Sequence, residues 1–148
     1  EGLFERVINS NLKNAYDLTG VFLNNLDISS KISIVYFSSV SYRRGAFENI
    51  AYSIAKAGLV GLTRSIAKRL GSRGVVNALA PGIILTNSSD NMPAEYVSRH
   101  AERLLNNIPM KRFGKPEEVA ELVNFLVSDA CTYMTGQVLN IDGGSHNS

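Results

Sequence analysis

Apolar residues recur along this chain with two different spacings, which predict helices and strands in turn. Over 2–25 and 50–70 they return every three or four positions, as on one face of an amphipathic helix. Short, nearly continuous apolar runs over 32–37, 75–80 and 138–141 are typical of strands covered on both faces. The pattern therefore predicts two long helices and three buried strands.

Two more helices are predicted in the second half of the chain. Residues 94–107 are amphipathic and rich in charge, and they follow a polar loop over 83–93. A further helix begins at 115–118, where a proline and two carboxylates suit a first turn, and it runs to Val127. With a polar loop over 38–49, the order of elements predicts an α/β fold with parallel strands and right-handed crossovers.

Composition indicates one ordinary globular domain. The chain has 148 residues, of which 45% are hydrophobic and 19% charged. With 15 basic and 13 acidic residues, its net charge of +2 is too small to indicate nucleic acid or a membrane surface as a partner. No apolar run approaches the roughly 20 residues of a membrane span. The single cysteine, Cys131, rules out an internal disulfide and favours a reducing, cytoplasmic location.

A hydroxyl, a phenol and an amine come together around the first strand-to-helix connection. Tyr52 and Lys56 are four residues apart, so a helix places them on one face. Ser38 or Ser39 follows the strand before it and can meet them at the carboxyl edge of a parallel sheet. A free phenol with a pKa of about 10 donates a proton readily, and a neighbouring ammonium favours the phenolate. The group is predicted to transfer protons.

Five linked motifs resemble those of the short-chain dehydrogenase/reductases, most closely the 3-oxoacyl-carrier-protein reductase group. They keep that family's order over nearly the whole chain. The motifs are Ser39, Tyr52-Ser-Ile-Ala-Lys56, Asn77-Ala-Leu-Ala-Pro81-Gly82-Ile-Ile-Leu-Thr86, Gly114-Lys-Pro-Glu-Glu-Val119, and Tyr133-Met-Thr-Gly-Gln-Val138 with Asp142-Gly-Gly144. The resemblance implies a doubly wound Rossmann-type fold, of whose seven-stranded sheet this chain would hold the last three strands.

The resemblance also implies catalytic roles. Tyr52 would be the general acid in ketone reduction and the base in alcohol oxidation, and Lys56 would support it and bond the nicotinamide ribose. Ser39 would bond the substrate oxygen, with Ser38 as its competitor, and Asn11 would hold a water on the proton relay. The ordinary alternatives are helix-surface side chains and a strand-end serine that closes its own turn.

The resemblance implies NADP or NAD as the cofactor, flanked by the segment that follows the second predicted strand. Gly82, next to Pro81, would let backbone approach a ligand closely. The backbone N–H of Ile84 and the hydroxyl of Thr86 would bind the carboxamide, and 87–107 would form a substrate lid. The alternative is a plain strand-to-loop turn.

One departure from the family shapes the functional prediction. No Gly-x-Gly-x-x-Gly turn and no nucleotide-binding half occur here, so residues 1–148 are expected to form a single domain truncated on its N-terminal side. The expected function is NAD(P)-dependent oxidation or reduction of a small carbonyl or alcohol substrate, a 3-oxoacyl group or similar ketone, free or carrier-bound. The expected assembly is a homo-oligomer, a dimer or tetramer. The alternative is a non-catalytic module that associates with itself or with a full-length relative.

A remote alternative is an acyl-enzyme of the Ser-x-x-Lys type. Ser53 to Lys56 and Ser65 to Lys68 both match that pattern, and 89–91 reads Ser-Asp-Asn. The Lys-Thr-Gly motif that such enzymes carry does not occur in the sequence.

The remaining charged residues predict no further site. His100 and His146 lack the spacing of metal ligands, so no metal site is expected. Arg43, Arg44 and Arg73 are interpreted as solvated charges, with contact to an acidic carrier protein as the alternative.

Overall fold

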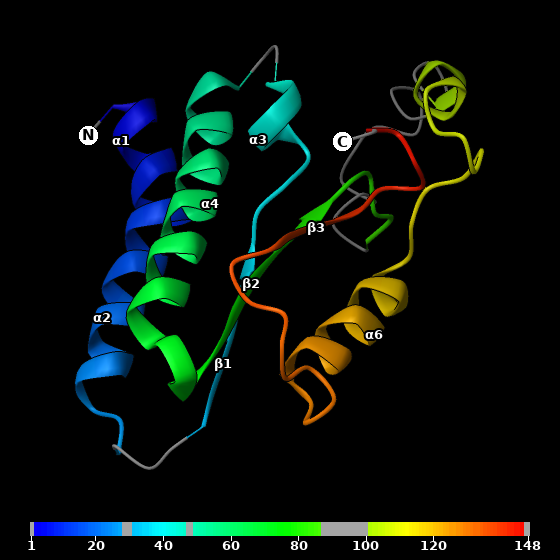
Figure 1. Ribbon diagram of the computed structural model, residues 1–148. Coiled ribbons are helices and arrows are strands. Elements are labelled where there is room, and N and C mark those ends of the chain that lie inside the picture. Colours follow the sequence, from blue (N-terminus) through cyan, green and yellow to red (C-terminus); the bar gives the residue numbers. More distant parts are fainter. Residues whose placement is uncertain (1, 28–30, 47–48, 87–100, 147–148) are drawn as a thin grey trace.

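The protein is described by a computed structural model that places most of the chain. The description covers every residue except 1, 28–30, 47–48, 87–100 and 147–148. Within it, a small parallel sheet carries helices on both faces, which confirms the predicted α/β fold (Figure 1). Among the described residues, no helix is long and apolar enough to cross a membrane.

The sheet has three parallel strands in the order β1-β2-β3. These are β1 (Ile32–Phe37), β2 (Gly74–Pro81) and β3 (Val138–Ile141). All six residues of β1 pair with β2, and the last four residues of β2 pair with β3. Because the strands are parallel, their carboxyl ends lie at one edge of the sheet, where α/β proteins place ligands.

One face of the sheet is covered by two long helical segments (Figure 1). The first consists of α1 (Leu3–Ile8), a π-helical turn η1 (Asn9–Lys13) and α2 (Asn14–Asn24). The second is α4 (Ile50–Leu70). Both helices were predicted from their apolar spacing, but the π-turn interrupts the first one, and no break in that spacing marks it.

The opposite face is covered by α6 (Pro116–Val127). The predicted start of this helix is confirmed, because Pro116 occupies its first turn and the Glu118 carboxylate accepts a hydrogen bond from the Lys115 N–H at 2.9 Å. Arg112 binds the same carboxylate through two nitrogens, at 2.8 and 2.6 Å. These contacts lower the pKa of Glu118 to about 2, with the Arg112 hydrogen bonds as the largest cause.

Alternate residues of β2 supply two separate hydrophobic cores. Val76 and Ala78 pack with Leu59 and Leu70 under α4, and the α2 segment closes this core. Val75 and Leu79 point to the other face, where they pack against Leu126 and Cys131 around α6. This period of two explains why β2 reads as a continuous apolar run: both of its faces are buried.

Three boundaries differ from the prediction. The middle strand is longer than 75–80: it begins at Gly74, where any Cβ would lie 2.2 Å from the Ile32 carbonyl oxygen, and it includes Pro81 as its last residue. The predicted loop over 38–49 contains a one-turn helix, α3 (Ser41–Arg44). A short 3-10 turn, η2 (Gly71–Arg73), ends α4.

Of the helix predicted over 94–107, residues 101–106 are helical, and 94–100 lie outside the described residues.

Candidate active site

Two hydrogen bonds tie the carboxyl end of β1 to the second turn of α4. The Lys56 Nζ donates to the Phe37 carbonyl oxygen at 2.8 Å. The Ser38 hydroxyl donates to the Lys56 carbonyl oxygen, also at 2.8 Å. Strand end and helix are thereby fixed together through one residue of the predicted catalytic set.

Tyr52 lies one turn before Lys56, and the predicted stacking of the two side chains is present. The Lys56 Nζ lies 5.3 Å from the centroid of the Tyr52 ring, within the range of a cation–π contact. Burial lowers the pKa of Lys56, because the partly covered ammonium loses hydration. The phenol and the amine therefore form one unit on one face of α4.

The position of Tyr52 depends on a residue that was read only as part of a polar loop. Asn49 is the N-cap of α4, and its side-chain oxygen accepts a hydrogen bond from the Tyr52 N–H at 3.0 Å. An asparagine directly before an apolar-periodic segment is a recognised N-cap signal, so the sequence does carry this information. The cap places Tyr52 in the first turn of the helix.

The two candidate serines have different surroundings. Ser38 is buried, and its hydroxyl is engaged by the Lys56 carbonyl. Ser39 is half-buried. Its hydroxyl donates to the Ser41 Oγ at 3.2 Å and accepts a hydrogen bond from the Ser41 N–H at 3.2 Å. Ser39 thus closes the turn into α3, whereas Ser38 bonds the backbone of α4 through a shorter hydrogen bond.

Asn11 lies in the centre of the π-turn η1. Its side-chain nitrogen donates to the Val7 carbonyl at 3.2 Å and to the Ser10 hydroxyl at 2.9 Å. The turn lies against α4 where that helix has Gly58, since a Cβ at Gly58 would come within 2.6 Å of a Leu12 methyl. Single π-turns occur frequently at functional sites. The turn therefore lies beside the helix that carries Tyr52 and Lys56, and Asn11 itself is half-buried.

The segment after β2 is held in place by backbone contacts. The Pro81 carbonyl accepts a hydrogen bond from the Val40 N–H at 3.2 Å, and the Gly82 N–H donates to the Ile141 carbonyl at 3.1 Å. A Cβ at Gly82 would lie 2.9 Å from Cα and Cβ of Asp142. Gly82 is therefore needed because the chain's own backbone at Asp142 approaches it closely. The sequence interpretation explained this glycine by the approach of a ligand and did not include the structural reason.

Ile84 forms an isolated parallel bridge with Gly114. The bridge uses the Ile83 carbonyl and the Leu85 N–H, at 3.0 Å each. No described residue accepts a hydrogen bond from the Ile84 N–H, which a parallel bridge directs to the side away from its partner. The predicted exposed donor at Ile84 is thus compatible with the backbone geometry.

Two cavities lie on either side of the Pro81–Ile84 segment. The first has a volume of about 460 Å³ and is bordered by Phe37 and by the predicted cofactor residues Pro81, Ile84 and Thr86, with an apolar wall from α6. The second has a volume of about 270 Å³ and is bordered by Val40 and Gly82. Tyr52 and Lys56 line neither of these two cavities, although Val40 directly follows Ser39.

The Ser-x-x-Lys alternative finds no support in the geometry. The Ser53 Oγ is buried with no hydrogen-bond partner in the described structure, so it is not accessible as a nucleophile. Lys56 is bonded to the Phe37 carbonyl, and 89–91 lie outside the described residues.

Among the residues that the structure describes, no group of three His, Cys, Asp or Glu side chains could hold a metal ion.

Comparison with known proteins identifies the family. A family model described as Enoyl-(Acyl carrier protein) reductase matches residues 2–146. A 3-oxoacyl-[acyl-carrier-protein] reductase of Thermotoga maritima is 42% identical over 142 residues, which are 95% of this chain and 56% of the relative. A second one, of Synechocystis, is 43% identical over 136 residues, 86% of this chain and 52% of the relative. The chain spans about half the length of the curated relatives it matches.

Solved structures agree with this assignment. A short-chain dehydrogenase/reductase of Brucella melitensis superimposes with a TM-score of 0.88 at 31% identity, covering 98% of this chain and 57% of that one. A candidate 2-deoxy-d-gluconate 3-dehydrogenase of Agrobacterium tumefaciens, solved with bound NADP, also gives 0.88 at 31% identity, covering 96% of this chain and 58% of that one. This chain therefore belongs to the short-chain dehydrogenase/reductase family.

Proposed function

We propose that this chain supplies the proton-transfer and substrate-binding part of an NAD(P)-dependent oxidoreductase that interconverts a carbonyl compound and its alcohol. The observation that carries the proposal is the junction of β1 and α4, where Lys56 bonds the strand end and lies over the ring of Tyr52. That arrangement fixes a phenol beside an ammonium at the carboxyl edge of the sheet, where ligands bind in α/β proteins.

In the reducing direction, the substrate oxygen gains negative charge as its carbon accepts a hydride. Tyr52 donates its phenolic proton to that oxygen, so the alkoxide becomes an alcohol and the phenol becomes a phenolate. The Lys56 ammonium stabilises the phenolate, and the Ser39 hydroxyl hydrogen-bonds the substrate oxygen while its charge develops. Asn11, beside α4, orders the water through which the phenolate regains a proton. Oxidation follows the same steps in reverse.

The nicotinamide end of the cofactor fits the larger cavity. Its lining combines apolar side chains with Pro81, Ile84 and Thr86, and the Ile84 N–H has no acceptor among the described residues. A flat aromatic ring with one carboxamide matches such a surface, with the amide bound by Ile84 and Thr86 and the ribose by Tyr52 and Lys56. When bound, the cofactor supplies or accepts the hydride. The Agrobacterium tumefaciens relative was solved with NADP, which supports a nicotinamide dinucleotide as the class of cofactor.

The relatives also suggest a substrate. The curated relatives of Thermotoga maritima and Synechocystis are named 3-oxoacyl-[acyl-carrier-protein] reductases, so a 3-oxoacyl group or a similar ketone is the first substrate to test. The reaction is best measured in a chimera that joins this chain to the part of the Thermotoga maritima relative that it does not match. NADPH consumption with acetoacetyl-CoA is the expected result, and a folded chimera that consumes none would contradict the proposal.

The 148-residue chain by itself provides the complementary test. The sequence contains no Gly-rich pyrophosphate turn, so we expect weak or undetectable binding of NADPH to this chain in calorimetry. The chimera should bind NADPH at least tenfold more tightly than the 148-residue chain if half the cofactor site comes from the Thermotoga maritima part. Micromolar binding by the short chain would show that the residues described above hold the cofactor without help.

A second candidate function is association without catalysis. Several large apolar side chains of the α1–α2 segment and of α4 are exposed: Leu3, Phe4, Leu18, Val21, Phe22, Ile50 and Ile54. We propose that a second copy of the chain, or a full-length relative, covers these helices, as a dimer or tetramer. Light scattering after gel filtration should give at least twice the monomer mass. A monomer at micromolar concentration would argue against this assembly.

A further inference from the structure

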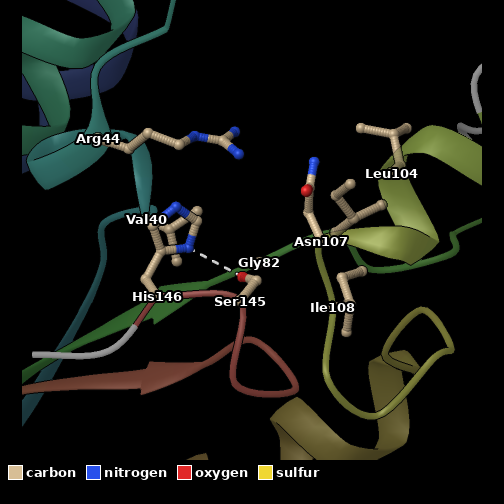
Figure 2. A pocket seen from close by; sticks show the side chains of 9 residues that line it. Val40, Arg44, Gly82, Leu104, Asn107, Ile108, Ser145 and His146 are labelled. Atoms are coloured by element: carbon tan, nitrogen blue, oxygen red, sulfur yellow. Dashed lines mark hydrogen bonds between the residues drawn. The ribbon is translucent and has the colours of Figure 1, made fainter.

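The smaller cavity is formed by four segments that are far apart in the sequence (Figure 2). Val40 and Arg44 come from α3 and the residue before it, and Gly82 and Ile83 follow β2. The helical residues 101–106 and the turn after them contribute Leu104, Asn107 and Ile108, and the chain end contributes Ser145 and His146. Val40 and Gly82 directly follow Ser39 and Pro81, so the cavity adjoins the candidate active site.

The only cationic group that the described residues contribute to this cavity is the Arg44 guanidinium, beside the polar side chains of Asn107, Ser145 and His146. Figure 2 shows the Arg44 side chain extending from α3 above His146 and toward Asn107. The Arg44 backbone N–H donates to the Val40 carbonyl at 3.1 Å, but its guanidinium has no hydrogen bond and no ion pair to a described residue. Leu104, Ile108 and Val40 add apolar surface between these polar side chains. Among the described residues, the lining therefore combines one guanidinium with apolar walls and includes no carboxylate.

Asp142 does not line the cavity, and both of its carboxylate oxygens are engaged by the residues that follow it. Its side chain is 7% exposed, and its Oδ1 accepts a hydrogen bond from the Gly144 N–H at 3.0 Å. Its Oδ2 accepts from the Ser145 hydroxyl at 3.1 Å and from the His146 N–H at 2.9 Å. The Ser145 Oγ also lies 2.9 Å from the His146 Nδ1, which fixes the imidazole against the cavity.

From this arrangement we propose that Arg44 selects carbonyl substrates that carry a compact anionic group, a carboxylate or a phosphate. The carbonyl would lie at Ser39 and Tyr52, and the anion would bind the guanidinium, with Asn107 and His146 as additional polar contacts. A planar guanidinium binds such groups with two parallel hydrogen bonds, which a solvated surface arginine does not need. The inference rests on the proposed function and adds a ligand role to Arg44, whose exposure agrees with its interpretation as a solvated charge in the free protein.

The test measures binding without cofactor, so that it is independent of hydride transfer. The isotope-labelled 148-residue chain is titrated with acetoacetate and, separately, with its uncharged methyl ester, and dissociation constants are taken from NMR shifts. Acetoacetate should bind at least fivefold more tightly than the ester, as expected of a charge-assisted hydrogen bond at a partly exposed site. Equal affinity for acid and ester, or no binding of either, would overturn the proposal.

Three variants assign the effect to one side chain. Arg44→Gln should weaken acetoacetate binding about fivefold or more and leave the ester unchanged, and Arg44→Lys should retain part of the affinity. Arg43→Gln is the matched control: Arg43 is exposed on the same one-turn helix but does not line the cavity. An equal loss in both glutamine variants would mean a general charge effect and would refute a specific role for Arg44.

Two further arms separate the possible outcomes. Phosphopantetheine presents a phosphate on a long arm. If it binds more tightly than acetoacetate, and Arg44→Gln abolishes that difference, the preferred anion is the phosphate of a carrier arm. A chimera that fails to consume NADPH while its Arg44-dependent binding persists would reject the proposed reaction and keep the anion site.

Discussion

The β1–α4 junction and the Pro81–Thr86 segment both lie at the carboxyl edge of the sheet, but they are held in different ways. The junction is fixed by side chains, with Lys56 and Ser38 each bonding the other element's backbone. The segment is fixed by backbone hydrogen bonds of Pro81 and Gly82 and by the bridge between Ile84 and Gly114. At Gly82 there is also no room for a Cβ. The junction thus positions the reactive side chains Tyr52 and Lys56, while the segment positions the backbone that borders the larger cavity.

This difference separates the kinds of damage that substitutions should cause. At the junction, a side chain can be changed while the backbone hydrogen bonds of β1 and α4 are retained, so the larger loss should appear in the reaction rate. In the segment, the backbone itself is the structure, so the loss should appear in stability. The following predictions test that division, beginning with the largest expected effect.

Tyr52→Phe in the chimera removes only the phenolic oxygen. The rate of ketone reduction should fall by a factor on the order of 10² to 10⁴, the usual contribution of a general acid. The free energy of unfolding, measured with urea, should be unchanged, because the Tyr52 side-chain oxygen bonds no described residue. A variant that keeps its turnover would remove Tyr52 from the mechanism.

Lys56→Met removes the ammonium that lies over the Tyr52 ring and the bond to the Phe37 carbonyl. The rate should fall about 10- to 100-fold, and the pH profile of alcohol oxidation should move to higher pH, since the phenolate loses its cation. Lys56→Arg retains the charge and is the control for it. A lower rate with an unchanged pH profile would limit Lys56 to a structural role.

Gly82→Ala tests the segment. The new Cβ would lie 2.9 Å from Asp142 backbone and side-chain carbons, so the chain should be destabilised by about 1–3 kcal/mol. Gly61→Ala is the matched control, because Gly61 lies on α4 with nothing within 4 Å of its Cβ position. That substitution should stabilise the helix by roughly 0.5–1 kcal/mol. Equal stability of the two variants in urea unfolding would contradict the backbone argument.

The same division explains what the sequence could reveal. Periodic elements such as β1 and α4 follow from apolar spacing alone, and the Tyr52–Lys56 pairing follows from helix geometry. The π-turn at Asn9–Lys13 leaves no mark in that spacing, since the apolar face continues through it. Pro81 argued against a strand, yet it fits as the last residue of β2, where its carbonyl still accepts a hydrogen bond.

The candidate site was predictable only where its residues are close in sequence. The place of Arg44 depends on Gly82, Asn107 and His146, which reach the same cavity from distant segments. No local pattern distinguishes Arg44 from Arg43, and only the fold separates a cavity-lining arginine from a solvated one. Asn49 is a different case, because its N-cap signal was present and was assigned only to the loop.

Asn49→Ala tests whether the cap supports the junction. Loss of the bond to the Tyr52 N–H should cost about 1 kcal/mol of unfolding free energy. Asn49→Ser keeps a capping oxygen and should retain most of the stability. In the chimera, the alanine variant should also lower kcat, because the first turn of α4 carries Tyr52. A stable alanine variant with unchanged kcat would show that tertiary contacts alone place Tyr52.

The smallest effect is expected at Glu118, in the first turn of α6. Arg112 and the Lys115 N–H lower the pKa of this carboxyl from about 4.5 to about 2, so the folded state favours its ionised form. A depressed pKa stabilises the fold above the unfolded value, and that contribution disappears as the pH falls from about 4.5 to about 2. Glu118→Gln should therefore be slightly less stable than the parent at neutral pH, and the difference should vanish near pH 2. Glu121→Gln, at an exposed position of the same helix, should show no such convergence, and unfolding curves across this pH range decide between the two.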